Sequence, residues 1–303
     1  MAKIELYKAL DMSLLLAWDG DVTIADSSHI QVTDGYRTQN YYGVFAYDSD
    51  GYLIDGFATS TTSLENGQIV FKASEFNVNA TTLESYVGSD AQAALQYVLS
   101  GDDTILGSSG NDKLIGYGGR DTIDGGGGLD VAYYDQSRNN FTVTGDGTTF
   151  HVTNFAGFSD TLVNIERVSF SDGTVLATDV EFGENTGSAY RLYKAAFDRT
   201  ADKAGLSYWV AELDSGRSIQ QIAQGFVDSA EFKQLNPALD QHSIINSYYQ
   251  NVLNRDADQA GYDYWSQQMS NGMKPNEVLV SFSESQENIS NTAAEIQSGI
   301  WLI

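Results

Sequence analysis

The sequence predicts a multidomain protein of mixed α and β class. We expect a β-rich N-terminal domain, a short parallel β-roll and an all-α C-terminal domain built from a 56-residue duplication. Three observations lead to this expectation. Short runs of β-branched and aromatic residues occupy positions 21–78, an aspartate then recurs every nine residues, and a helical pattern near the C-terminus occurs twice. The expected domains span 1–97, 98–184 and 185–303.

The N-terminal domain is expected to form strands joined by tight turns. The clearest hairpin turns at DSDG, residues 48–51, between VFAY and YLID. A helix is predicted over 81–99, with Ser89 and Gln92 as a capping box. Because this helix leads directly into the nine-residue repeat, a role in covering the first apolar layer of the roll is favoured over packing elsewhere. The helix carries an apolar stripe: Ala93, Ala94, Leu95, Val98 and Leu99.

Four consecutive copies of a nine-residue pattern follow. They read VLSGDDTIL, GSSGNDKLI, GYGGRDTID and GGGGLDVAY over residues 98–133. The template is GGxGxDxUx, where U is apolar. The U positions are Ile105, Leu114, Ile123 and Ala132. A turn followed by a short strand in every copy stacks into a parallel β-roll with a thin apolar column. The alternative, a flexible acidic linker, is disfavoured because glycine, aspartate and an apolar residue all recur at the same nine-residue interval.

The chemistry of this pattern is that of an oxygen-lined cation site. Glycine permits backbone conformations that direct carbonyl oxygens towards a common centre. Calcium takes about six to eight oxygen ligands at about 2.3–2.6 Å. Backbone carbonyls and one carboxylate from each of two stacked loops meet that requirement.

These residues resemble the hemolysin-type calcium-binding repeats of the RTX family. The resemblance implies that ions lie between loops two copies apart, which pairs Asp103 with Asp121 and Asp112 with Asp130, and that about two or three ions bind. The second copy departs from the pattern at Ser108. The implied calcium-site residues are Gly101, Asp103, Gly107, Gly110, Asp112, Gly116, Gly118, Gly119, Asp121, Gly125, Gly128 and Asp130. The nearby acids Asp102, Asp124 and Asp135 are interpreted as solvated charges.

Strand patterns resume after the repeat. Residues 141–155 and 159–174 are expected to continue the sheet, and the second segment resembles the one that closes the roll in many RTX proteins. From about residue 185 the pattern becomes helical. The run that starts at Tyr190 aligns without gaps with the run that starts at Asn246. This unit is similar to an uncharacterised domain common at the C-termini of RTX proteins.

Conserved features of the two copies predict their local structure. Asp202 and Asp258 are expected to cap the helices that carry the aromatic pairs Tyr208-Trp209 and Tyr264-Trp265. The pairs are interpreted as core rather than as a platform for a ligand, because they occupy matching helical positions.

Composition excludes several classes of function. With 41 acidic and 16 basic side chains the formal charge is −25, which disfavours nucleic acids and anionic membrane surfaces as partners. The absence of cysteine excludes disulfides and thiolate chemistry. No segment predicts a transmembrane span, and the N-terminus lacks the pattern of a cleaved secretory signal. The RTX resemblance implies type I secretion through an uncleaved C-terminal signal, here expected to overlap SGIWLI at 298–303.

No catalytic motif is present. The sequence contains neither HExxH nor GxSxG, and His29, His151 and His242 are far apart. A pair of carboxylates for glycoside cleavage would leave no local motif. Two segments, 48–51 and 254–261, resemble parts of EF-hand loops but lack the acid at position 12, so a turn and a helix cap are the favoured interpretations.

The leading hypothesis is a secreted or cell-surface calcium-binding protein of a Gram-negative bacterium. Its roll would fold on extracellular calcium and serve adhesion, matrix or surface-layer interaction. Candidate partners are the type I secretion machinery, a cell-surface glycan, a matrix polymer or a second copy of the chain. The alternative is a secreted hydrolase or lyase that acts on an extracellular polymer. A deep N-terminal pocket lined by paired carboxylates would favour that alternative.

Overall fold

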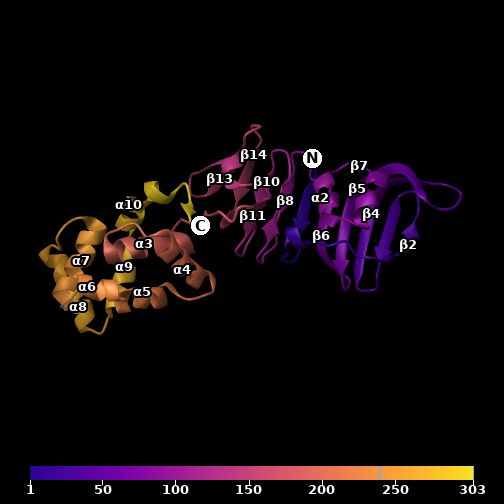
Figure 1. The fold of residues 1–303 in the computed structure, drawn as a ribbon. Coiled ribbons are helices and arrows are strands. Elements are labelled where there is room, and N and C mark those ends of the chain that lie inside the picture. The colour runs from indigo at the N-terminus through magenta and orange to yellow at the C-terminus, as the bar shows by residue number, and fades with distance from the viewer. Residues whose placement is uncertain (238–239, 303) are drawn as a thin grey trace. The chain divides into compact units, whose positions relative to one another are not determined.

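The computed structural model describes residues 1–237 and 240–302. The chain divides into two compact units, Met1–Thr174 and Val175–Ile303 (Figure 1). The last residue of the expected secretion signal, Ile303, lies outside the described residues. In the part of the chain that the structure describes, no helix has both the length and the apolar character that crossing a bilayer requires.

The first unit begins with an antiparallel sheet. Its strands follow chain order: β2 (Asp21–Ala25), β3 (His29–Thr33), β4 (Arg37–Tyr47), β5 (Leu53–Glu65) and β6 (Gln68–Ser74), with β7 (Val78–Asn79) paired to β5. The predicted hairpin joins β4 to β5. Oδ1 of Asp48 accepts hydrogen bonds from the backbone N–H groups of Asp50 and Tyr52, both at 2.9 Å. The segment 48–51 is therefore a turn, as expected.

Two short helices follow this sheet, α1 (Ala80–Val87) and α2 (Ala91–Val98). The predicted capping box at Ser89 is wrong. Asp90 caps α2 by accepting from the N–H of Ala93 at 3.0 Å, whereas the Ser89 hydroxyl donates to a carbonyl of the preceding helix. Gln92 instead donates to the carbonyl oxygen of Met12 at 2.9 Å.

Strand β1 (Lys3–Leu6) joins the N-terminal sheet to the roll. It is antiparallel to β6 and parallel to β8 (Thr104–Leu106). The same face of the roll continues in parallel through β10 (Thr122–Asp124) and β14 (Ser159–Val163), and then in antiparallel fashion through β13 (Thr149–Asn154) and β12 (Phe141–Gly145). The opposite face contains the parallel strands β9 (Lys113–Leu114), β11 (Val131–Tyr134) and β15 (Arg167–Phe170). The expected continuation of the sheet beyond the repeat is confirmed. Two single turns of 3₁₀ helix, Met12–Leu14 and Arg138–Asn140, complete this unit.

Two apolar columns form the core of the roll, and none of their side chains is more than 2% exposed. The first column contains Ile4, Ile105, Ile123 and Leu162. The second contains Met12, Leu114, Ala132 and Val168. Strand β1 therefore covers the first apolar layer, and the sequence-based assignment of that role to the helix over 81–99 is wrong. The roll can begin with a strand because Ile4 extends the column by one residue.

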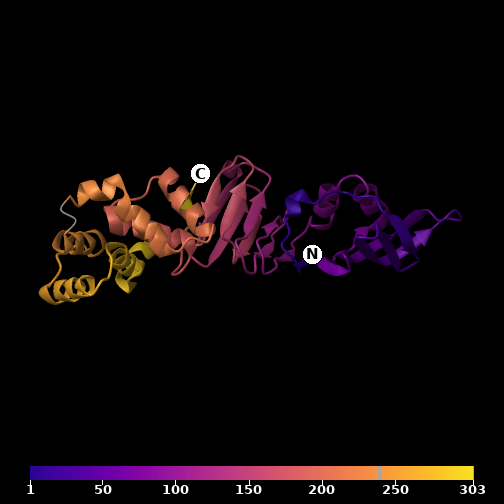
Figure 2. The ribbon, with the colours of Figure 1, turned by 90° about the horizontal axis from the view of Figure 1, so that it is seen from below.

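The second unit is helical and its duplication is regular. One copy consists of α3 (Asn185–Phe197), α4 (Lys203–Asp214), α5 (Ile219–Asp228) and α6 (Ala230–Leu235). The other consists of α7 (Gln241–Leu253), α8 (Gln259–Ser270), α9 (Pro275–Ser283) and α10 (Gln286–Ile296), shown in orange and yellow in Figure 2. The strands β16 (Val175–Ala177) and β17 (Ile300–Trp301) pair with each other in the same unit. The segment SGIWLI thus contributes a strand rather than a helical end.

The predicted caps of this unit are confirmed. Asp202 accepts from the N–H of Gly205 at 2.8 Å, and Asp258 accepts from the N–H of Gly261 at 2.7 Å. In each aromatic pair, the tryptophan packs against the core and the tyrosine is exposed. Trp209 and Trp265 each pack against a core phenylalanine with ring centroids 5.0 Å apart. Their neighbours Tyr208 and Tyr264 are each 53% exposed.

Candidate metal centre in the β-roll

The repeat aspartates form two hydrogen-bonded ladders through the roll. In the first ladder, made of Ala2, Asp103, Asp121 and Asp160, each backbone N–H donates to Oδ1 of the next aspartate. The distance is 2.9 Å from Asp103 to Asp121 and 3.0 Å from Asp121 to Asp160, and the N–H of Ala2 donates to Asp103. Loops two copies apart therefore lie directly against each other.

The second ladder repeats this geometry with Leu10, Asp112, Asp130 and Glu166. The N–H of Leu10 donates to Asp112 at 2.6 Å, that of Asp112 to Asp130 at 2.7 Å, and that of Asp130 to Oε2 of Glu166 at 2.7 Å. The structure brings together the two expected pairs, Asp103 with Asp121 and Asp112 with Asp130.

The second carboxylate oxygens leave the ladders without protein partners. Oδ2 of Asp103, Asp121 and Asp130 is buried and accepts no hydrogen bond from the described residues. A buried carboxylate oxygen without a donor is costly unless a cation satisfies it. Asp112 differs, because its Oδ2 accepts from the N–H of Ser108 at 2.6 Å and from its hydroxyl at 2.9 Å.

Burial changes the acidity of these groups. Desolvation, aided by the charge of Asp160, raises the pKa of Asp121 to about 8. Desolvation also raises the pKa of Asp130 to about 7, although the N–H of Asp112 opposes the shift. The pKa of Asp103 and that of Asp160 are raised for the same reason. The fold without a bound cation therefore disfavours the charged form of these carboxylates, and a cation would favour it.

Glycines at the first position of the repeat leave space beside these oxygens. A Cβ on Gly116 would collide with Oδ2 of Asp121, and a Cβ on Gly125 would lie 2.7 Å from Oδ2 of Asp130. A Cβ on Gly107 would collide with the carbonyl of Gly125 and lie 3.2 Å from Oδ2 of Asp112. The space around each carboxylate exists because these residues lack side chains.

The remaining predicted glycines serve loop stacking to different degrees. Gly119 and Gly128 have φ of 128° and 129°, and each would bring a Cβ against the loop two copies earlier, at Gly101 and Gly110 respectively. Gly118 faces open space, with no atom within 4 Å of a Cβ built on it. It is the predicted site residue with the weakest structural requirement for glycine.

Two acidic members of the ladders, Asp160 and Glu166, were missed by reasoning from the repeat because they lie beyond its last copy. For Asp160 a local signal exists. The triplet Asp160-Thr161-Leu162 repeats the sequence pattern of Asp103-Thr104-Ile105 and Asp121-Thr122-Ile123. Glu166 has no such signal, since its position follows from the pairing of β15 with β11.

The donor set is oxygen only and is drawn from stacked loops. Among residues 1–237 and 240–302, no three His, Asp or Glu side chains gather as a metal cage. Carboxylates in pairs, together with backbone carbonyls of glycine-rich loops, are the ligands that a hard cation such as calcium accepts. The neighbouring acids have other partners: Asp102 accepts from the N–H of Arg120 and Asp124 from the side chain of Asn164, both at 2.8 Å.

Comparison with known families agrees with this geometry. The model described as the RTX calcium-binding nonapeptide repeat, in four copies, matches residues 97–132. The chain carries RTX calcium-binding repeats. A second model, described as a domain of unknown function (DUF4214), matches residues 180–236 and 237–292. The helical duplication is thus a tandem pair of DUF4214 domains.

Comparisons with whole proteins add a similar structure. No curated protein is similar to this chain. A solved structure, the extracellular lipase LipA from Serratia marcescens, is similar at 28% identity over 23% of this chain, with a TM-score of 0.16. The matched region spans 13% of the lipase chain.

Proposed function

We propose that this protein is a secreted or cell-surface protein whose β-roll folds on extracellular calcium. The observation that carries the proposal is the set of buried, unpartnered Oδ2 atoms of Asp103, Asp121 and Asp130. In the proposed site these oxygens and the carbonyls of the glycine-rich loops hold the ion. Asp112 and Asp130 would form the weaker of the two pairs, because Ser108 already satisfies Oδ2 of Asp112.

Charge explains why folding would wait for calcium. Residues 100–189 contain 14 acidic and four basic side chains, and the core of the roll is only two columns wide. Bound calcium supplies positive charge between stacked carboxylates and links adjacent loops. A ligand that binds only the folded state stabilises that state by RT ln(1 + [L]/Kd). In a cell where calcium is scarce, the repulsion favours an open chain suited to type I secretion.

The proposed role outside the cell is adhesion, matrix or surface-layer interaction. The sequence contains no catalytic motif for the hydrolase alternative, so we favour the adhesive role. An N-terminal pocket of about 380 Å³ is lined by one carboxylate, Glu65, which pairs with Lys8 at 2.9 Å. An adjoining cavity is lined by two exposed carboxylates, Asp19 and Glu84. A glycosidase needs two such groups. A screen against immobilised glycans and whole bacterial cells tests the adhesive role, which binding to neither would oppose.

Thermal unfolding with added calcium tests the main proposal. At a calcium concentration of about 100 Kd the stabilisation is about 2.7 kcal/mol per site, or a rise in Tm of about 5–10 °C for a unit of this size. Chelator should reverse the rise, and magnesium at equal concentration should produce a smaller one. A Tm that does not respond to millimolar calcium would refute the proposal.

Two matched glycine variants place the effect in the roll. Gly116→Ala adds a methyl group where Oδ2 of Asp121 lies, so the calcium-induced rise should largely disappear. Gly118→Ala adds the same group in open space and should keep the rise. Equal calcium responses in the two variants would contradict the assignment of Asp121 to the site.

A further inference from the structure

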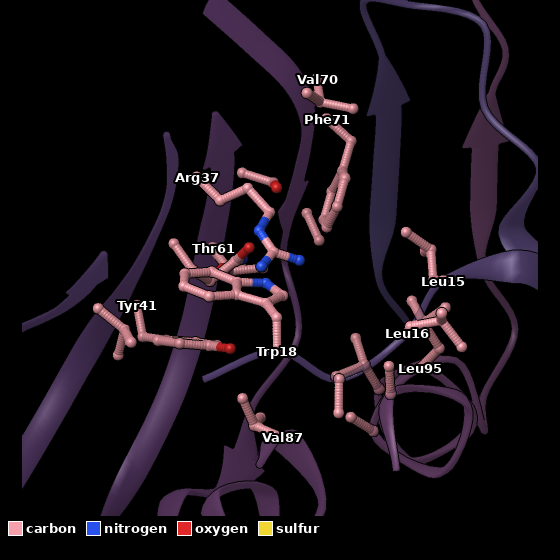
Figure 3. A pocket seen from close by; sticks show the side chains of 18 of the residues that line it. Leu15, Leu16, Trp18, Arg37, Tyr41, Thr61, Val70, Phe71, Val87 and Leu95 are labelled. Carbon is pink, nitrogen blue, oxygen red and sulfur yellow. The ribbon is translucent and has the colours of Figure 1, made fainter. Parts of the chain in front are cut away.

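A largely apolar cavity of about 380 Å³ lies inside the N-terminal part of the first unit. One wall is the face of strands β3–β6, a second is formed by α1 and α2, and a third by the segment from Leu14 to Trp18 (Figure 3). Three residues of the apolar stripe, Ala94, Leu95 and Val98, line this cavity from α2. The volume falls within the range of about 300–1,000 Å³ that is typical of sites for small molecules.

A second cavity of about 260 Å³ extends the first. The two cavities share five lining residues: Trp18, Val32, Tyr41, Leu83 and Val87. Trp18 and Tyr41 therefore stand where the two spaces meet. An occupant that uses both spaces must be elongated.

The charged groups that line the first cavity are already neutralised, and the two acids that line the second cavity, Asp19 and Glu84, are exposed to solvent. The guanidinium of Arg37 lies 4.7 Å from the centre of the Trp18 ring, and its Nε donates to Asp34 at 2.8 Å. The carboxylate of Glu65 pairs with Lys8. A charged ligand would have to break one of these ion pairs or remain without an oppositely charged partner in the cavity. Burying an unpaired charge is costly.

The hydroxyl of Tyr41 is a polar group that points into this apolar space without a protein partner. The hydroxyl of Tyr41 is directed towards the cavity beneath Trp18 (Figure 3), and no described residue forms a hydrogen bond with it. Burial raises the pKa of Tyr41, so its hydroxyl stays neutral and available as a donor. The side chains of Gln39 and Thr61 on the same wall are hydrogen-bonded to each other, since Gln39 donates to Thr61.

We propose that this pocket binds a neutral, elongated, apolar molecule with one hydrogen-bond acceptor, which receives the Tyr41 hydroxyl. A medium-chain alcohol or a neutral acyl compound has this chemistry. The apolar walls would hold the chain and Tyr41 would orient the polar end. This binding goes beyond the calcium-dependent function and does not require it.

Displacement of a fluorescent probe tests the proposal on the full chain in calcium. N-phenyl-1-naphthylamine is neutral and apolar, and it should bind saturably with one site per chain. 1-Octanol should displace it at concentrations well below those of octanoate, because the pocket has no unpaired cation for a carboxylate. Tyr41→Phe should weaken the binding of 1-octanol by about three- to tenfold, which corresponds to the loss of one hydrogen bond.

A pair of helix variants provides the control. Ala94→Phe fills the cavity from α2 and should abolish probe binding, whereas Ala93→Phe adds the same ring at a residue that does not line the cavity and should preserve it. Equal binding by both variants would overturn the proposal. Probe release on self-association would also overturn it, since a second copy would then be the occupant. If the unchanged chain does not bind the probe but is stabilised by calcium, this inference alone is contradicted. If it binds the probe but its Tm does not respond to calcium, the calcium proposal alone is contradicted.

Discussion

The carboxylates of Asp121 and Asp130 perform two tasks with their two oxygens. Oδ1 accepts the backbone N–H of an aspartate in a loop two copies earlier, at 2.9 Å for Asp121 and 2.7 Å for Asp130. Oδ2 remains buried beside a glycine. One oxygen thus holds the loops together and the other is available to a cation. An asparagine would keep the first task and lose the charge needed for the second.

The raised pKa values of Asp121 and Asp130 predict how the calcium-free protein responds to pH. The pKa of Asp121 is about 8 and that of Asp130 about 7 in the folded state, against 3.8 for an ordinary aspartate. The folded state thus binds more protons than the unfolded state between these limits, and stability falls as pH rises through about 7–8. The Tm in chelator should fall from pH 6 to pH 9.

Asp121→Asn supplies the control for this experiment. The variant lacks the group with the larger shift, so its Tm should depend less on pH over the same range. Saturating calcium should also weaken the dependence in the unchanged protein. A Tm that rises with pH in chelator would show that the carboxylates remain charged in the calcium-free fold.

At the scale of elements, strand β1 has the widest consequences. It pairs with the N-terminal sheet on one side and with the roll on the other. The carbonyl oxygen of Ala2 accepts the N–H of Thr104 at 2.9 Å, which repeats the bond between the carbonyl of Asp103 and the N–H of Thr122. Ile4 lines the N-terminal pocket and also begins the first apolar column of the roll. The order of the roll and the shape of the pocket therefore depend on one strand.

Truncation of Ile4 tests this dependence. Ile4 is 2% exposed, so Ile4→Ala should reduce the free energy of unfolding by about 2–5 kcal/mol and raise the calcium concentration needed for folding. Val22 in β2 is 62% exposed, and Val22→Ala should change stability by no more than about 0.5 kcal/mol. Chemical denaturation at several calcium concentrations measures both quantities. A calcium midpoint that Ile4→Ala leaves unchanged would show that β1 is not part of the folding unit of the roll.

At the scale of the whole molecule, the two units have separate sources of stability. The first contains the ladders and their unpartnered oxygens. The second has a continuous apolar core that runs through all eight helices from α3 to α10. Its stability comes from packing of aromatic and aliphatic side chains, so we expect it not to depend on calcium.

Calorimetry should resolve this difference as two unfolding transitions. When calcium at about 100 Kd is removed, the Tm of the first unit should fall by about 5–10 °C for each site that loses its ion. The Tm of the helical unit should not change. In a Trp18→Phe variant the remaining tryptophans all belong to the second unit, so their fluorescence identifies the second transition. Equal shifts of both transitions on chelation would contradict the separation.

Periodic features of the chain were open to prediction and non-local contacts were not. The interval of nine residues identified the equivalent aspartates of the four copies, and the resemblance to RTX repeats implied which of them pair. The positions of Asp160 and Glu166 depend on strands that return to the roll after a hairpin, which no local interval records. The residue that caps α2 is Asp90, one position after the predicted Ser89. Serine and aspartate can both accept a hydrogen bond from the first turn of a helix, so local sequence does not decide between them.

The sequence by itself determined the repeat, its oxygen chemistry, the tandem helical domains and the absence of thiol chemistry, because each depends on residue type and spacing alone. Only the tertiary structure decided that β1 is the first layer of the roll and that α2 covers a pocket instead. Both depend on which apolar faces meet. The four residues of β1 and the stripe of α2 are too short to specify a partner, so the choice is made by the surfaces that the rest of the first unit offers them.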